Sequence, residues 1–142
     1  MKKIIILFIA CLCMCPALAG CKIFEKYTLQ DKYRNEWGVE LPQTMNEVYK
    51  IKNSGFNDEV SCTVYSVDRE EMKTLSDRFS PMTEAEFLGL ERNYTAMIGD
   101  LEDKYKPRYE NGLTAEYASK RSSVYVVYDE NLAFLYLFDL KI

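Results

Sequence analysis

The chain carries five cysteines, and their positions decide what chemistry each one can do. Three of them, at positions 11, 13 and 15, lie in an apolar N-terminal segment, and Cys21 follows that segment directly. Cys62 is isolated, so it has no cysteine neighbour for a disulfide framework. In "VSCTVYSV" it shares one side of an alternating pattern with Val60 and Val64. We therefore predict a buried, unreactive thiol on a strand rather than a nucleophile.

Histidine is absent from all 142 residues. This absence excludes Ser-His-Asp and Cys-His catalysis, general acid–base chemistry by histidine, and the commonest metal ligand. The sequence also contains no glycine-rich phosphate loop, no Cys-x-x-Cys pair and no EF-hand spacing. We accordingly expect no metal and no cofactor, and we expect that the protein is not an enzyme.

Paired carboxylates are the remaining candidate for catalysis, because two acids can catalyse glycoside hydrolysis. Acids can also bind Ca²⁺. Acids gather at Asp58-Glu59, at Glu84 and Glu86, and between Asp100 and Asp103. Acids in a first helical turn are explained by the helix dipole, and acids in a turn by solvation. A histidine-free envelope hydrolase nevertheless stays open as the alternative. It requires two acids roughly 5 to 9 Å apart across a concave pocket.

Eleven tyrosines raise the possibility of a face that binds sugar or protein, since tyrosine combines apolar area with a hydroxyl. We expect most of them to be half-buried positions of the core instead. One basic and aromatic cluster, "KYKPRY", is a candidate contact for phosphate headgroups or an anionic wall polymer, with a solvated loop as the alternative. The tentative contact residues are Lys104, Lys106, Arg108, Lys120 and Arg121.

The N-terminal segment has the organisation of a targeting signal. Lys2 and Lys3 form a positive start, residues 4–17 are apolar, and Leu18-Ala19-Gly20 supplies small residues before Cys21. The apolar run falls short of the roughly 20 residues that a spanning helix needs. We expect residues 1–20 to be removed as a signal peptide, leaving residues 21–142 as the mature protein.

Leu18-Ala19-Gly20-Cys21 resembles the lipobox of bacterial lipoproteins, which reads Leu, a small residue, Gly or Ala, then Cys. The resemblance covers the first 21 residues only. It implies that the Cys21 thiol receives a diacylglyceryl group, that cleavage falls between Gly20 and Cys21, and that the new terminus is often acylated as well. Two or more acyl chains give stable membrane attachment. The alternative is an ordinary secretory signal cut after Ala17 or Ala19, which leaves a free thiol.

The mature chain keeps all 22 acids and 16 of the 18 basic residues, a formal charge of −6. An acidic balance argues against nucleic acid as a partner. Residues 21–142 are enough for one hydrophobic core, so we expect a single extracytoplasmic domain. The expected partners are the membrane, through the lipid, and a protein or an envelope polymer.

The elements of that domain are predicted from periodicity and from turn and capping residues. A helix over 24–37 ends at Gly38 and Pro42, and "NSGFND" separates two strands of a hairpin. Capping boxes at Asp68/Glu71 and Thr83/Glu86 start a short helix over 69–79 and a long one over 83–105. After Pro107 a polar stretch runs to Ser122, and a second hairpin closes the chain.

These elements predict an α+β fold in the order α-β-β-α-α-β-β: an antiparallel sheet of about four strands packed with about three helices. The last strand is apolar on both sides, with Phe134, Tyr136 and Phe138 opposite Leu135 and Leu137. We therefore expect a central strand in a sheet covered on both faces. The N-terminal helix is expected on one face, and the pair of helices over 69–79 and 83–105 on the other.

Overall fold

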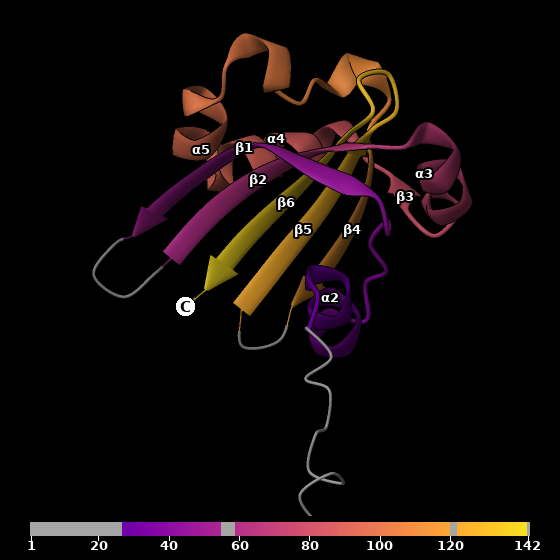
Figure 1. Cartoon of the computed structure of the whole chain (residues 1–142). Helices are drawn as coiled ribbons and strands as arrows, with labels where there is room; N and C mark the ends of the chain where they lie inside the picture. Colours follow the sequence, from indigo (N-terminus) through magenta and orange to yellow (C-terminus); the bar gives the residue numbers. More distant parts are fainter. Residues whose placement is uncertain (1–26, 55–58, 120–121, 142) are drawn as a thin grey trace, which may run out of the picture.

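The fold is α+β and is built on one antiparallel sheet (Figure 1). The computed structural model describes residues 27–54, 59–119 and 122–141. Within them the sheet has six strands in the order β1-β2-β6-β5-β4-β3. The strands are β1 (Met45–Ser54), β2 (Glu59–Val67), β3 (Ser80–Pro81), β4 (Thr114–Ser119), β5 (Ser122–Asp129) and β6 (Phe134–Lys141). The helices are α2 (Leu29–Trp37), α3 (Arg69–Ser76), α4 (Glu84–Asn93), α5 (Thr95–Asp100), and the 3₁₀ turns η1 (Asp103–Tyr105) and η2 (Tyr109–Asn111).

Both predicted hairpins are present. β1 pairs with β2 and β5 pairs with β6, each antiparallel, and β6 also pairs with β2. The final strand is therefore central, as its two-sided apolar pattern predicts. Tyr136 and Phe138 are buried in one core cluster, and Leu135 and Leu137 in the other.

The sheet is larger than the sequence pattern indicates. The polar stretch after Pro107 contains β4, which pairs with β5 along its whole length, and Ser80-Pro81 forms the short strand β3 beside it. The prediction of about four strands was wrong because β4, "TAEYAS", has no apolar run of its own. Its strand conformation depends on pairing with the apolar β5, a tertiary contact that local patterns do not report.

The long helix predicted over 83–105 is divided into α4 and α5. Thr83 and Glu86 form the complete capping box that the sequence predicts. The helix ends at Tyr94, whose backbone leaves the helical region at φ −122° and ψ 25°. The Thr95 hydroxyl donates to the carbonyls of Glu91 and Arg92, the latter at 3.2 Å. Such back-bonding competes with the regular helical pattern, and here it accompanies the break.

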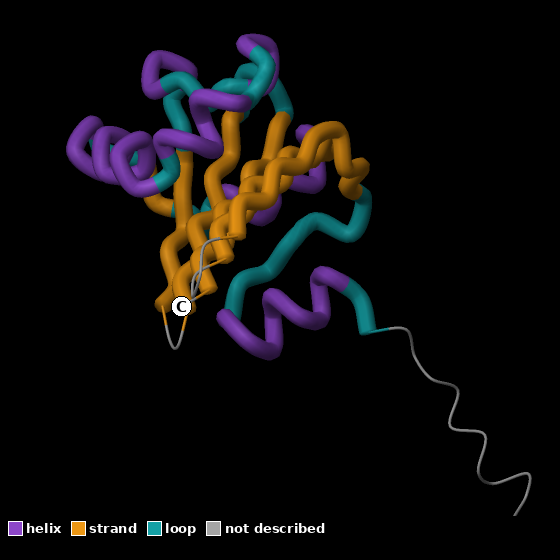
Figure 2. Tube along the Cα trace, turned by 90° about the vertical axis from the view of Figure 1, so that its left-hand side faces the viewer, coloured by secondary structure: helices purple, strands orange, loops and turns teal. Residues whose placement is uncertain are grey.

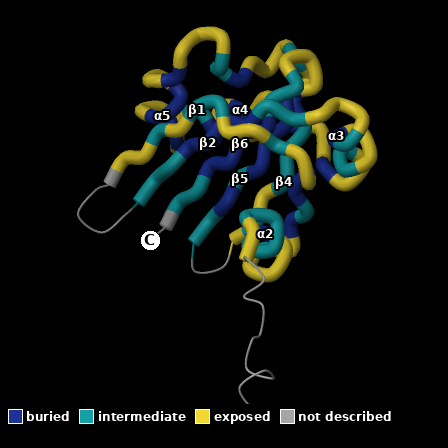
Figure 3. The backbone as a smooth tube through the Cα atoms, viewed as in Figure 1, coloured by how far each residue is buried: buried dark blue, intermediate teal, exposed yellow. Residues whose placement is uncertain are grey.

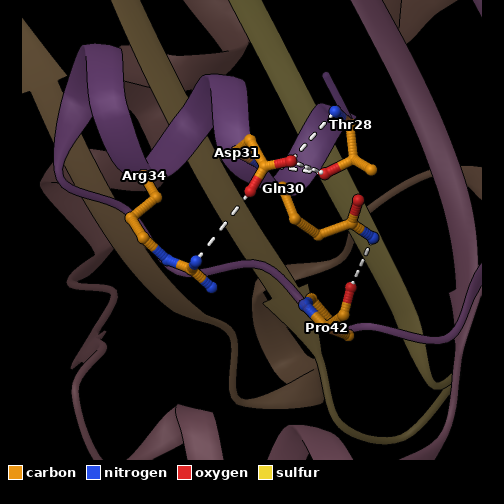
Figure 4. Close-up of polar contacts among 5 residues, drawn as sticks. All are labelled: Thr28, Gln30, Asp31, Arg34 and Pro42. Atoms are coloured by element: carbon orange, nitrogen blue, oxygen red, sulfur yellow. Dashed lines mark hydrogen bonds and ion pairs between the residues drawn. The ribbon is translucent and has the colours of Figure 1, made fainter. Parts of the chain in front are cut away.

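Helix α2 begins at Leu29 rather than at Phe24. Thr28 is extended and acts as the N-cap: its hydroxyl accepts from the Asp31 amide, and its own amide donates to the Asp31 carboxylate at 3.1 Å (Figure 4). Gly38, with φ 76°, ends the helix in the left-handed conformation that glycine adopts without strain. Gln30 then donates to the Pro42 carbonyl at 2.8 Å and holds the connector to β1 against the helix (Figure 4).

Both faces of the sheet are covered, and burial is greatest in β2, β6 and β5 (Figures 2 and 3). Phe87 of α4 and Met97 of α5 pack on the face that carries Tyr136. Tyr33 of α2 and Met72 of α3 pack on the face that carries Leu135. Helix α3 therefore lies on the same face as α2, and the prediction that pairs it with the following helix was wrong. Its apolar stripe indicates that it packs on a sheet but carries no information about which face.

Candidate binding groove

The acids that the sequence singles out lie at separate places among the described residues. Glu84 and Glu86 lie exposed at the start of α4, and Asp100 and Asp103 lie exposed around η1. Glu59 makes an ion pair of 2.8 Å with Lys52, while Asp58 lies outside the described residues. Within the described ranges, no group of three or more acids and cysteines is arranged to hold a metal ion.

Cys62 lies on β2 with no exposed surface, packed in the cluster beneath α4 and α5. Burial, and after it the nearby charge of Asp139, raises the pKa of its thiol to about 12. A thiol with this pKa is almost wholly protonated at neutral pH and is therefore a poor nucleophile. The structure agrees with the prediction of a buried, unreactive side chain.

The described part of the basic and aromatic cluster lies in and around η1 and η2. Lys104 makes an ion pair of 2.9 Å with Glu102, and Lys106 one of 2.8 Å with Asp103, so these two lysines are locally balanced. Arg108 is exposed, while Lys120 and Arg121 lie outside the described residues. Of the five tentative contact residues, the structure therefore describes Lys104, Lys106 and Arg108.

Most tyrosines belong to the core, as the sequence predicts. Five are buried, namely Tyr33, Tyr65, Tyr94, Tyr128 and Tyr136, and three are partly buried, namely Tyr49, Tyr105 and Tyr125. The three exposed ones are Tyr27, Tyr109 and Tyr117. Of these, Tyr117 stands beside a groove and packs against a second tyrosine.

This groove, hereafter the β3–β4 groove, has a volume of about 320 Å³. It is lined by Arg78, Ser80, Met82, Glu86, Ala115, Glu116, Tyr117 and Tyr125. It exists because β3 is short: Ser80 pairs with Ala115 and Pro81 with Thr114, whereas β4 continues to Ser119. Over 116–119 the outer edge of β4 has no strand partner among the described residues, and the groove opens beside it.

Tyr117 and Tyr125, the aromatic residues of the groove, stand at the outer end of a row of paired residues that runs across β2, β6, β5 and β4. Cys62 pairs with Phe138, Phe138 with Tyr125, and Tyr125 with Tyr117. The row passes from a fully buried centre to Tyr117, which is 52% exposed. The rings of Tyr117 and Tyr125 are 4.5 Å apart between centroids, with an angle of 37° between their planes. Together they form one aromatic surface.

The Tyr117 ring is held from its far end. Its hydroxyl donates to Ser123 at 3.2 Å, and the Ser123 hydroxyl donates to Ser119 at the same distance. Hydrogen bonding to Ser123, and after it to Ser119, lowers the pKa of Tyr117. These contacts orient the ring although half of it is exposed.

Two acidic residues, Glu86 and Glu116, are among those that line the groove, and their environments differ. Glu86 accepts from the Thr83 amide and hydroxyl, both at 2.8 Å, and these bonds lower its pKa. Burial raises the pKa of Glu116, with Arg78 acting in the opposite direction and Glu40 in the same one. Arg78 in turn makes an ion pair with Glu40. Glu116 thus belongs to a charged cluster with Arg78 and Glu40, whereas Glu86 belongs to the cap of α4.

Sequence reasoning missed this groove because it missed β4 and β3. The signal that was present is the alternation of Ala115, Tyr117 and Ser119, which is typical of a strand.

Comparisons with family models, with curated proteins and with solved structures find no match to this chain. Within the described residues no helix is long and apolar enough to cross a membrane.

Proposed function

We propose that this chain is a membrane-anchored extracytoplasmic lipoprotein, and that its α+β domain is a noncatalytic module that binds a protein or an envelope component. The observation that carries the proposal is the sequence Leu18-Ala19-Gly20-Cys21 behind a positive and apolar start. Acylation of Cys21 places the domain at the surface of a membrane, with the lipid as its anchor.

The segment between Cys21 and the described fold is short, because α2 begins at Leu29. Residues 22–28 separate Cys21 from the helix, and seven residues span at most about 25 Å when extended. This reach is longer than the one implied by a helix starting at Phe24, and it keeps the domain near the bilayer.

The noncatalytic part of the proposal rests on chemistry. Histidine is absent, the Cys62 thiol is buried and protonated, and several acids of the described surface, among them Asp31, Glu86 and Asp103, are engaged in helix caps or ion pairs. A solvated acidic surface with one aromatic groove favours binding over turnover.

The anchoring test is to feed expressing cells an alkyne-tagged fatty acid, to fractionate them, and to determine the mass of the N-terminal peptide. Wild type should carry the label, fractionate with membranes, and begin at a modified Cys21. Cys21→Ser should carry no label, and Cys62→Ala is the matched control that should keep it. A wild-type peptide with a free Cys21 thiol, or one that begins at Leu18 or Gly20, contradicts the proposal.

One observation favours the hydrolase alternative: Glu86 and Glu116 line the same groove and have pKa values shifted in opposite directions. Such a difference is typical of an acid and its partner carboxylate in glycosidases. The alternative predicts that oligosaccharides of the envelope are cleaved by wild type and not by Glu116→Gln. The binding proposal predicts no cleavage by either, measured by chromatography of the reducing ends.

A further inference from the structure

We propose that the β3–β4 groove binds an uncharged saccharide of the cell envelope, stacked on the Tyr117–Tyr125 surface. The inference rests on the proposed function, because it names the class of partner that the binding module recognises. It is carried by three features of the groove: an exposed aromatic surface, polar residues in its lining, and the sign of the local charge.

The aromatic surface suits a pyranose ring. The C–H bonds on one face of such a ring form an apolar patch, which packs on the face of an aromatic side chain. With centroids 4.5 Å apart, Tyr117 and Tyr125 offer more contact area than one ring. The hydrogen bond from Tyr117 to Ser123 orients the outer ring before binding. A ring oriented in advance loses little conformational entropy when a ligand packs on it.

The polar residues of the lining suit hydroxyl groups. Glu86 of α4 lines the groove beside the apolar Met82, on the face of the sheet that carries Tyr125, whereas Glu116 alternates with Tyr117 along β4 and lines the groove with Arg78 from the other face. Carboxylates and guanidinium groups form charge-assisted hydrogen bonds with neutral partners such as sugar hydroxyls. An apolar floor with a few convergent polar groups is the usual composition of a small-molecule site.

The charge of the groove selects against anionic polymers. Arg78 is balanced by its ion pair with Glu40, so Glu86 and Glu116 give the groove a negative excess. Phosphate or carboxylate groups of a polymer would meet this excess at short range. The groove volume of about 320 Å³ lies at the lower end of the range for ligand pockets, which fits one or two sugar rings.

An extended peptide paired with the open edge of β4 is the competing occupant. The open edge covers only 116–119, and backbone hydrogen bonds between a peptide and this edge give the Tyr117 ring no specific role. The saccharide is therefore the occupant that uses more of what the groove presents.

The test uses the full mature lipoprotein in a detergent without a sugar headgroup, titrated with chitotriose and cellotriose and observed by NMR of the sugar protons. Stacking should move the C–H protons of one pyranose face upfield, through the ring currents of the tyrosines. Tyr117→Ala should weaken binding about tenfold or more and abolish these shifts. Tyr117→Phe keeps the ring and should bind within about threefold of wild type. Tyr27→Ala removes an exposed tyrosine elsewhere and is the matched control.

The inference is overturned if neither oligosaccharide binds at about 10 mM, if Tyr117→Ala binds like wild type, or if polygalacturonate competes for the same residues. It is also overturned if an extended peptide, and no sugar, shifts the amide signals of residues 116–119. The mass of the N-terminal peptide from the same preparation reports acylation of Cys21 separately. A preparation that is acylated and binds no sugar refutes the saccharide site alone and leaves the anchoring proposal intact.

Discussion

The Tyr33 hydroxyl donates to the Asp139 carboxylate at 2.7 Å, across 106 positions of the chain. Tyr33 is the buried residue of α2, and Asp139 lies near the end of β6. This bond connects α2 to the central strand at the end of the sheet where the described chain begins and where it ends (Figure 1). It is a polar contact that holds α2 on its face of the sheet.

Replacing Tyr33 by phenylalanine removes this donor and leaves the partly buried Asp139 carboxylate without it. Hydrogen bonds to charged groups contribute about 1.5–3 kcal/mol, and partial access to water reduces that figure. We expect Tyr33→Phe to lower the free energy of unfolding by about 1–2 kcal/mol at pH 7, measured by urea denaturation. Tyr27→Phe, on an exposed ring, should change nothing. Equal stability of Tyr33→Phe and wild type would refute this role.

Alkaline pH should unfold the protein through its buried tyrosines. Burial, and then the Asp139 charge, raise the pKa of Tyr33 above its ordinary value, and burial raises the pKa of Tyr65 to about 12. Unfolded tyrosine ionises near pH 10, so these groups support the fold below pH 10 and cease to do so as the pH rises above it. Tyr33→Phe should therefore lose stability less steeply than wild type above pH 10, by up to about 1.4 kcal/mol per pH unit. Parallel curves would contradict the assignment.

The Cys62 thiol should not react with thiol reagents in the folded protein. We expect an aromatic disulfide reagent to find no reactive thiol in the native mature protein and one after denaturation, because Cys21 is acylated on our proposal. Two thiols after denaturation would show that Cys21 is free.

The surroundings of Cys62 also predict an order of stability among its variants. Cys62→Ser should be less stable than Cys62→Ala by about 1–3 kcal/mol, since a buried hydroxyl would lack a partner. The comparison is made by urea denaturation, and the reverse order would contradict an apolar site.

Two glycines should respond to alanine with opposite signs. An added methyl group meets nothing within 4 Å at Gly89 or at Gly38. Gly89 lies within α4, where alanine should raise the free energy of unfolding by about 0.5–1 kcal/mol. Gly38 has φ 76°, where alanine is strained and should lower it by about 1 kcal/mol. Thermal unfolding of both variants measures the difference, and a shared sign would contradict it.

Glu71 should hold a loop rather than cap its helix. Asp68 caps α3 by accepting from the Glu71 amide at 3.0 Å, but the Glu71 carboxylate accepts from the amides of Gln43 and Thr44. We expect Glu71→Ala to speed hydrogen exchange at residues 43 and 44 and to leave the amides of α3 protected. Glu71→Gln keeps an acceptor and should have the smaller effect. Faster exchange confined to α3 would restore the capping-box interpretation.

This difference at Glu71 shows the limit of what local sequence patterns predict. The spacing Asp68/Glu71 is the same as Thr83/Glu86, and both predict a helix start correctly. Only the second spacing forms the full box, because in the first the connector 38–44 passes close enough for its amides to take the Glu71 carboxylate. The choice between two acceptor roles depends on a segment 27 or more positions away.

The sequence alone determined the two hairpins, the C-terminal end of α2, the start of α4, the central place of β6, and the burial of Cys62. Each follows from alternation, capping or turn residues within a few positions, which report how a segment meets water and the core. Its lipobox-like start also carries the anchoring proposal.

Only the tertiary structure decided that "TAEYAS" is a strand, that α3 shares a face with α2, and that Tyr117 and Tyr125 meet beside an open edge. These outcomes depend on pairing between distant segments and on which face has room, and amphipathic patterns specify neither. The candidate groove belongs to this second group, because it exists where a two-residue strand stops short of its six-residue neighbour.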